Sequence, residues 1–156
     1  MKRSAGLLLF RHRDGHLEVL LGHPGGPYWA NKDLQAWSIP KGEYAEDEEA
    51  LAAAQREFRE ETGYACAPPF TDLGELRQPG GKLVHIWACA GDADPAALVS
   101  NGFEMEWPPK SGRMQRFPEF DRVQWFGMEE AQRRILTGQR EFVERLAQGL
   151  RKDERG

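Results

Sequence analysis

The chain has 156 residues, of which 40% are hydrophobic and 29% charged, a mixture typical of folded globular domains. This length predicts a single domain over residues 1–156 with a buried core and a C-terminal end that frays. The net charge of −4 argues against general affinity for nucleic acids or anionic membranes, and no apolar run reaches the roughly 20 residues of a membrane-spanning helix. Cys66 and Cys89 lack metal-binding spacing and form no disulfide framework, which favours a reducing, cytoplasmic setting.

The N-terminal part of the chain predicts short buried strands joined by turns. Its first apolar run is too short for a helix, and Asp14-Gly15 is typical of a β-hairpin turn. The following loop is rich in glycine and proline, so its aromatic residues Tyr28 and Trp29 are expected to be exposed or to cap the fold. The predicted elements are strands at 4–11, 16–22 and 36–40 and a loop at 24–33.

Residues 47–62 give the strongest helix prediction. Apolar side chains recur at helical spacing and form one stripe, which indicates that this helix packs on a core. Gly63 is typical of the residue that ends a helix. The stripe consists of Ala50, Leu51, Ala54 and Phe58.

The C-terminal part predicts further strands and then two helices. A strand is expected within 64–76, and 108–118 is expected to be a loop because it contains three prolines and a glycine. The other predicted elements are strands at 82–90, 102–107 and 122–126 and helices at 128–136 and 139–150. This order of elements indicates an α/β or α+β fold with a mixed sheet and helices packed on it.

The acidic residues are concentrated in one stretch. Residues 43–61 contain eight acids and two bases, a charge of −6, whereas the rest of the chain is +2. Within this stretch Glu57, Glu60 and Glu61 are spaced so that one helix turn carries all three carboxylates on one face. A solvated acidic helix face is the simpler interpretation, but hard cations such as Mg²⁺ also prefer carboxylate oxygens.

A longer pattern favours the metal interpretation. From Gly42 to Tyr64 the sequence GEYAEDEEALAAAQREFREETGY resembles the signature of the Nudix hydrolases. The matching positions are Gly42, Glu48, Arg56, Glu57, Phe58, Glu60, Glu61 and Gly63, with Tyr64 where an aliphatic residue is usual.

The resemblance implies an α/β/α sandwich in which the signature forms a loop, a helix and a loop. It implies Mg²⁺ or Mn²⁺ held by Glu57, Glu60 and Glu61 and by the backbone carbonyl of Gly42. Arg56 and Glu48 would form a supporting ion pair. The implied reaction is hydrolysis of a phosphoanhydride in a nucleoside diphosphate linked to a further group.

The general base and the outer metal ligands are less closely defined. Glu61 or Glu57 is expected to act as the catalytic base. Some family members use an acid outside the signature, and Glu104 and Glu106 are the candidates here, with Glu104 as the expected metal ligand. Their spacing places both on one face of a strand. The alternative for both is a solvent-exposed strand edge.

Substrate-binding residues are sought among cations and exposed aromatic rings. Tyr28 and Trp29 are candidates for stacking on a nucleobase, whereas Trp37, Trp87 and Trp125 lie in predicted strands and are expected in the core. Several cationic side chains are expected to bind the phosphates of the substrate. The alternative is that they only keep the protein soluble. These cations are Lys41, Lys110, Arg113 and Arg116.

One further resemblance narrows the choice of substrate. The stretch WSIPKG at 37–42, followed by the signature, is similar to the diadenosine tetraphosphate hydrolase branch of the family. The first hypothesis is therefore asymmetric cleavage of this dinucleotide to ATP and AMP. The alternatives are a general, damaged-nucleotide or capped-RNA pyrophosphohydrolase, a nucleotide-binding sensor or partner-binding module without catalysis, and a structural domain without metal. Many family members dimerise, so a homodimer is one expected state, which the sequence does not decide.

Overall fold

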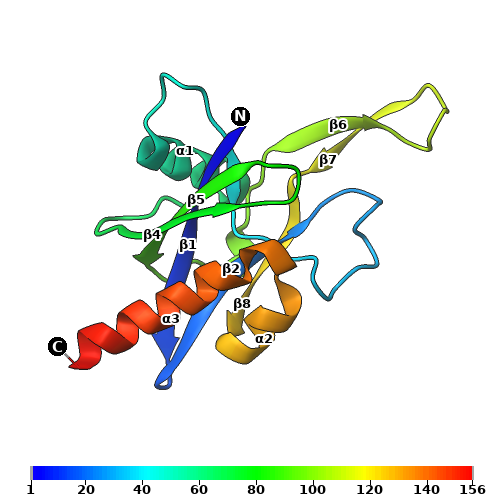
Figure 1. The fold of residues 1–156 in the computed structure, drawn as a ribbon. Coiled ribbons are helices and arrows are strands. Elements are labelled where there is room, and N and C mark those ends of the chain that lie inside the picture. The colour runs from blue at the N-terminus through cyan, green and yellow to red at the C-terminus, as the bar shows by residue number, and fades with distance from the viewer. Residues whose placement is uncertain (1, 156) are drawn as a thin grey trace.

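The computed structural model describes residues 2–155 and the side chains of residues 2–152. A six-stranded mixed sheet forms its centre (Figure 1). The strand order is β4-β5-β1-β2-β8, and the short strand β3 pairs with β1 beside β2. The strands are β1 Arg3–Arg13, β2 His16–Pro24, β3 Lys41–Glu43, β4 Thr71–Arg77, β5 Leu83–Ala90 and β8 Phe120–Gly127.

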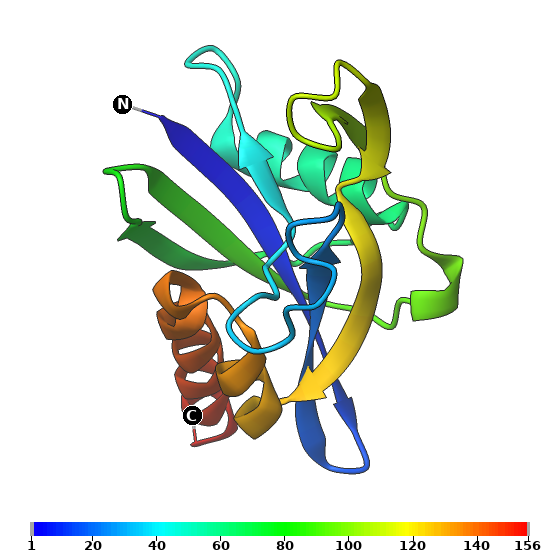
Figure 2. The ribbon, with the colours of Figure 1, turned by 90° about the vertical axis from the view of Figure 1, so that its right-hand side faces the viewer.

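Helices cover both faces of this sheet, so the expected α/β/α sandwich with a mixed sheet is confirmed (Figures 1 and 2). Helix α1 (Ala50–Thr62) packs on one face, where Phe58 is fully buried among apolar side chains of β1 and β5. Helices α2 (Met128–Arg134) and α3 (Arg140–Arg155) bury Phe142 and Leu146 against the other face. Two buried clusters, one on each face, therefore fix the orientation of α1.

Gly63 ends α1 as predicted. Its backbone has a φ of 79°, in the left-handed region that glycine favours, and its N–H donates to the carbonyl of Arg59 at 2.8 Å. The helix begins at Ala50, three residues later than predicted, because residues 47–49 belong to the turn that leads into it.

Two expectations about the elements were wrong. Residues 36–40 form only isolated bridges, from Ser38 to Gly22 and from Trp37 to Ile135, and the regular strand follows at β3. The expected loop 108–118 contains a strand, β7 (Met114–Pro118), that pairs with β6 (Gly102–Glu106). The last helix, α3, continues to Arg155, five residues beyond the predicted end at residue 150, and residue 156 lies outside the described residues; the expected fraying of the C-terminal end stays a prediction.

β6 and β7 form a two-stranded ribbon that projects from the sheet (Figure 1). The loop after β2, residues 25–40, passes beside this ribbon, and Tyr28 of the loop lies edge to face on Trp107, with ring centroids 6.0 Å apart. This ribbon and this loop therefore lie side by side. None of the helices among residues 2–155 is both long and apolar enough to cross a membrane.

Candidate functional site

Helix α1 holds Glu57 against the backbone of β3. An ideal Cβ built on Gly42 would lie 2.1 Å from the carboxyl carbon of Glu57, so only glycine leaves room for this carboxylate. Gly42 is aligned with Ala5 of β1, whose buried methyl group faces α1. Burial raises the pKa of Glu57, and the guanidinium of Arg56 acts in the opposite direction. The structure therefore brings Gly42 and Glu57 together.

Arg56 links the helix to the loop that precedes it. Its Nε donates to Oε2 of Glu48 at 2.8 Å and its Nη2 to Oε1 at 3.0 Å, which confirms the predicted ion pair. Its Nη1 donates to Glu57 at 2.9 Å and lies 3.3 Å from a carboxylate oxygen of Glu60. These contacts lower the pKa of Glu48. One guanidinium thus partly neutralises three carboxylates.

Glu61 is the most deeply buried of the acids on α1, with 7% of its surface exposed. Burial raises its pKa to about 9, and the negative charges of Glu57 and Glu119 add to this effect. Among the described residues, its Oε2 is the one buried side-chain nitrogen or oxygen without a hydrogen-bond partner. A buried oxygen without a partner costs free energy, and a cation bound there would remove that cost.

Lys41 is the cation whose charge stabilises the charged form of this buried acid. Burial lowers the pKa of Lys41, while the carboxylate of Glu61 is the strongest influence that raises it. Lys41 also lowers the pKa of Glu61. The sequence proposed Lys41 for outer phosphates, and the structure places it against the acids of α1.

Glu119 is a site residue that sequence reasoning missed. It lies half-buried between β7 and β8, and its charge raises the pKa of Glu61. Its backbone is held from both sides, since its N–H donates to Asn101 and its carbonyl accepts from Gly25, at 2.8 and 2.9 Å. The sequence gives no spacing that points to this residue, because it joins the acids of α1 only in the folded chain.

A cavity of about 310 Å³ opens beside Glu119. Tyr28 and Trp29, the two predicted stacking residues, both line it. The ammonium of Lys32 lies 5.1 Å from the centre of the Trp29 ring, a favourable cation–π position. The remaining lining residues are Pro24, Gly25, Gly26, Phe103 and Met105. This aromatic cavity is therefore built from the loop after β2, from β6 and from Glu119.

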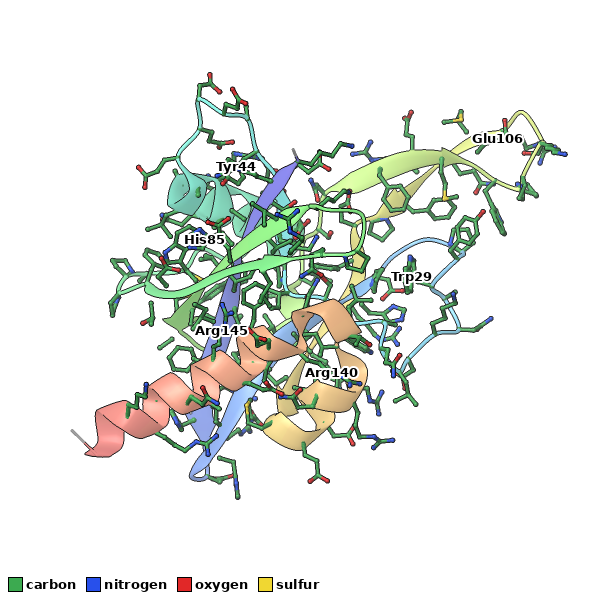
Figure 3. All side chains as sticks on the ribbon, in the orientation of Figure 1. Trp29, Tyr44, His85, Glu106, Arg140 and Arg145 are labelled. Atoms are coloured by element: carbon green, nitrogen blue, oxygen red, sulfur yellow. The ribbon has the colours of Figure 1, made fainter. Side chains whose placement is uncertain are left out.

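The predicted residues of the ribbon lie away from the cavity. Glu104 is exposed on β6, on the opposite side of the strand from Phe103 and Met105, and its cross-strand partner is Arg116. Glu106 lies towards the end of the ribbon and accepts from the backbone N–H of Lys110 (Figure 3). Lys110 and Arg113 are exposed in the turn at that end. Among the described residues, Glu104 belongs to no group of three acidic, histidine or cysteine side chains that could hold a metal ion.

The three core tryptophan predictions hold to different degrees. Trp37 and Trp87 are buried, and Trp125 is partly buried under the guanidinium of Arg11, which lies 4.1 Å from its ring centre. His85 stacks on Trp87 with the rings 3.9 Å apart. Both cysteines are free thiols.

The family follows from comparison of the sequence with known domains. A model described as NUDIX domain matches residues 1–146. The chain belongs to the Nudix family. The predicted resemblance and the predicted enzyme class, a Nudix pyrophosphohydrolase, are thereby confirmed. Nudix enzymes generally use divalent metal ions. Comparison with curated proteins finds no significant match.

Solved structures share the Nudix fold at low sequence identity. The Caenorhabditis elegans Ap4A hydrolase, solved as a binary complex, has a TM-score of 0.64 and 20% identity, and the match covers 97% of this chain and 99% of that one. The NUDIX domain of Shewanella oneidensis NrtR, solved with ADP ribose, has a TM-score of 0.65 and 18% identity, with 95% and 87% covered. A mutT/nudix family protein from Listeria innocua has a TM-score of 0.61 and 18% identity, and the match covers 97% of this chain and 95% of that one.

The donor set on α1 fits a divalent cation by its chemistry. Glu57, Glu60 and Glu61 offer carboxylate oxygens, and the buried Oε2 of Glu61 lacks a partner. Among the described side chains, residues 2–152, however, no three acidic, histidine or cysteine groups converge closely enough to enclose an ion. The carboxylates of Glu57 and Glu60 both contact the guanidinium of Arg56.

Proposed function

We propose that this Nudix protein hydrolyses a dinucleoside polyphosphate, with asymmetric cleavage of diadenosine tetraphosphate to ATP and AMP as the leading reaction. The observation that carries the proposal is the position of Glu119, which both lines the aromatic cavity and acts on Glu61. A base held in the cavity therefore has its phosphates beside the acids of α1. The fold likeness to the C. elegans Ap4A hydrolase supports the same substrate.

We propose that Glu57, Glu60, Glu61 and the carbonyl of Gly42 hold Mg²⁺ or Mn²⁺. Such an ion neutralises phosphate charge and lowers the pKa of bound water when it is present. The chain's own contribution is a buried carboxylate, Glu61, that gains its charge only when a cation offsets its burial. Glu61 or Glu57 then accepts the proton of the attacking water.

Substrate binding is assigned to three groups of residues. Tyr28 and Trp29 stack on a base, since both line the cavity. Lys41, half-buried beside Glu61, meets the phosphates next to the bond that breaks. Lys110 and Arg113 are exposed on the ribbon and reach only the outer part of a long substrate.

Two acids compete for the role of the carboxylate outside α1. Glu104 is the choice from sequence, and Glu119 is the acid whose charge acts on Glu61. We propose Glu119 for this role, and glutamine variants of both residues distinguish them.

The proposal extends to organisation and location. A single domain over residues 1–156, a cytoplasmic location and a homodimer remain proposals, as does the lack of general affinity for nucleic acids and membranes. The two free thiols support a reducing compartment.

A substrate panel tests the proposed activity. The purified protein is given Mg²⁺ and, separately, diadenosine tetraphosphate, common and oxidised nucleoside triphosphates, and ADP-sugars, and the products are resolved by chromatography. The proposal predicts the highest kcat/KM for the dinucleotide, with ATP and AMP in equal amounts. Faster release of pyrophosphate from a triphosphate would instead support the triphosphate pyrophosphohydrolase that the sequence left open.

A further inference from the structure

His23 is a fully buried histidine at the end of β2, between β8 and the loop that carries Tyr28 and Trp29. Its Nδ1 lies 3.0 Å from both carboxylate oxygens of Asp121 on β8. Its Nε2 lies 2.6 Å from the backbone carbonyl of Lys32 in the loop. One ring therefore joins Lys32 and Asp121, which are 89 residues apart in the sequence.

Both nitrogens of this ring face acceptors. A carbonyl oxygen cannot donate, so Nε2 carries a proton and donates it to Lys32. A second proton lies between Nδ1 and the carboxylate of Asp121, because two bare acceptors at 3.0 Å would repel each other. The fully buried His23 and the partly exposed Asp121 thus form a pair of net charge zero with two donated hydrogen bonds.

The surroundings of this pair are polar groups that already have partners. Arg122 lies 3.6 Å from Asp121 and also stands over the ring of Trp37, which meets His23 edge to face. Asp33 accepts from Nε1 of Trp37 at 3.1 Å and pairs with Arg134. Asp121 is thus the charged side chain in direct contact with His23, whereas Arg122 reaches it through Asp121 and Asp33 through Trp37.

The carbonyl that His23 holds belongs to the residue that fixes Trp29. The N–H of Lys32 donates to the carbonyl of Trp29 at 3.0 Å, and its ammonium lies 5.1 Å from the Trp29 ring. On the other side of the cavity, Asp121 follows Glu119 by two residues. The hydrogen bonds of His23 thus connect the two walls of the aromatic cavity.

We propose that His23 is a positioning residue that fixes the aromatic loop in its base-binding position by joining Lys32 to Asp121. This inference rests on the proposed function only in assuming that the aromatic cavity takes the base of the substrate. His23 does not line the cavity and touches no reacting atom. Its loss therefore weakens substrate binding and leaves the chemical step in place.

Hydrogen–deuterium exchange tests the positioning without any substrate. The variants are His23→Leu, which removes both donors, and His23→Gln, which retains a single amide donor. The control is Leu9→Ala, which removes a fully buried side chain of β1 from the cluster on the opposite face of the sheet, a cluster that contains no residue of 25–36, and so lowers stability without touching the loop. We expect exchange in residues 25–36 to become at least about tenfold faster in His23→Leu and to change less in His23→Gln.

Kinetics test the consequence for function, with whichever substrate the unaltered protein cleaves. We expect KM to rise at least about tenfold in His23→Leu, less in His23→Gln, and kcat to stay within about twofold. Leu9→Ala should leave KM unchanged. Faster loop exchange with an unchanged KM, or a fall in kcat at constant KM, would overturn the inference, and so would an unchanged loop in both His23 variants.

An NMR measurement of the unaltered protein separates this inference from the proposed function. Nitrogen-15 spectra should show a slowly exchanging proton on each ring nitrogen of His23, unlike the exposed His12 and His16. If the unaltered protein cleaves no substrate in the panel, the proposed function is contradicted. The ring protons and the loop exchange would still decide whether His23 holds the loop. A ring with only one protected proton would contradict the inference.

Discussion

The acids of α1 and the aromatic cavity meet at Glu119, yet they are assembled in different ways. Glu57, Glu60 and Glu61 come from one helical turn, so their arrangement follows from spacing alone. The cavity takes Trp29, Phe103 and Glu119 from segments that only the tertiary structure brings together. The comparison teaches that the residues proposed for chemistry are encoded locally, whereas those proposed for substrate choice depend on the whole fold.

The two regions also differ in their exposure to water. Glu61 is 7% exposed and its pKa is raised to about 9, whereas Tyr28 is 64% exposed. A buried carboxylate responds strongly to any charge brought near it, because water screens that charge poorly. An exposed ring offers a surface for stacking at little desolvation cost. Disruption of α1 should therefore reduce catalysis, and disruption of the cavity should reduce affinity.

The largest expected effect comes from Glu61→Gln. This change keeps the size of the side chain and removes the charge that appears when a cation offsets burial, so we expect kcat to fall at least about 100-fold. Glu46→Gln, an exposed acid ahead of α1, is the matched control and should retain full activity. Steady-state kinetics with Mg²⁺ measure both, and a loss of less than tenfold in Glu61→Gln would show that the site is assigned wrongly.

Phe58→Ala tests the packing that orients the acids. Its ring is fully buried between α1 and the sheet, so we expect the free energy of unfolding to fall by about 3–5 kcal/mol. Urea denaturation measures this change. Near-normal stability would mean that the apolar stripe of α1 does not hold the helix in place.

Glu119→Gln and Glu104→Gln compare the two acids outside α1. Because Glu119 acts on Glu61 and Glu104 is exposed on the ribbon, we expect kcat/KM to fall about 10-fold or more for Glu119→Gln and to stay within about twofold for Glu104→Gln. The reverse order of the two effects would restore Glu104 as the outer carboxylate.

The smallest expected effect belongs to Trp29→Ala. Stacking of one base on an aromatic ring contributes about 1–3 kcal/mol, so we expect KM to rise about tenfold with little change in kcat. Tyr28→Phe keeps its ring and should behave like the unaltered protein. If kcat falls instead of KM rising, the cavity takes part in the chemical step and the division between the two regions fails.

The sequence was sufficient for the parts of the molecule that follow from local spacing. The apolar periodicity predicted α1, its end at Gly63 and the burial of Phe58, and the resemblance to the signature implied the ion pair of Arg56 with Glu48. Tyr28 and Trp29 were predicted as stacking candidates because they lie in a Gly-Pro loop, and both line the cavity. Each of these predictions depended on residues that lie close together in the sequence.

The remaining site residues had no local signal. Glu119 stands between Pro118 and Phe120, in the short segment between the predicted loop 108–118 and the predicted strand 122–126, and its partner Glu61 is 58 residues away. His23 has no metal-ligand spacing in the sequence, and its partners in the structure, Lys32 and Asp121, share no motif with it. Ribbon strand β7 was missed because its pairing with β6 overrides the turn-forming residues around it.

Calorimetric titration of the ion-free protein with Mn²⁺ tests the central claim most directly. The pKa of Glu61, about 9, lies above its ordinary value of 4.5, so its carboxyl is mainly protonated at pH 8 and must lose that proton to bind a cation. Measured in two buffers of different ionisation enthalpy, the unaltered protein should release about one proton per ion at pH 8. Glu61→Gln should release far less. Absence of Mn²⁺ binding, or equal proton release from both proteins, would contradict a cation site at Glu61.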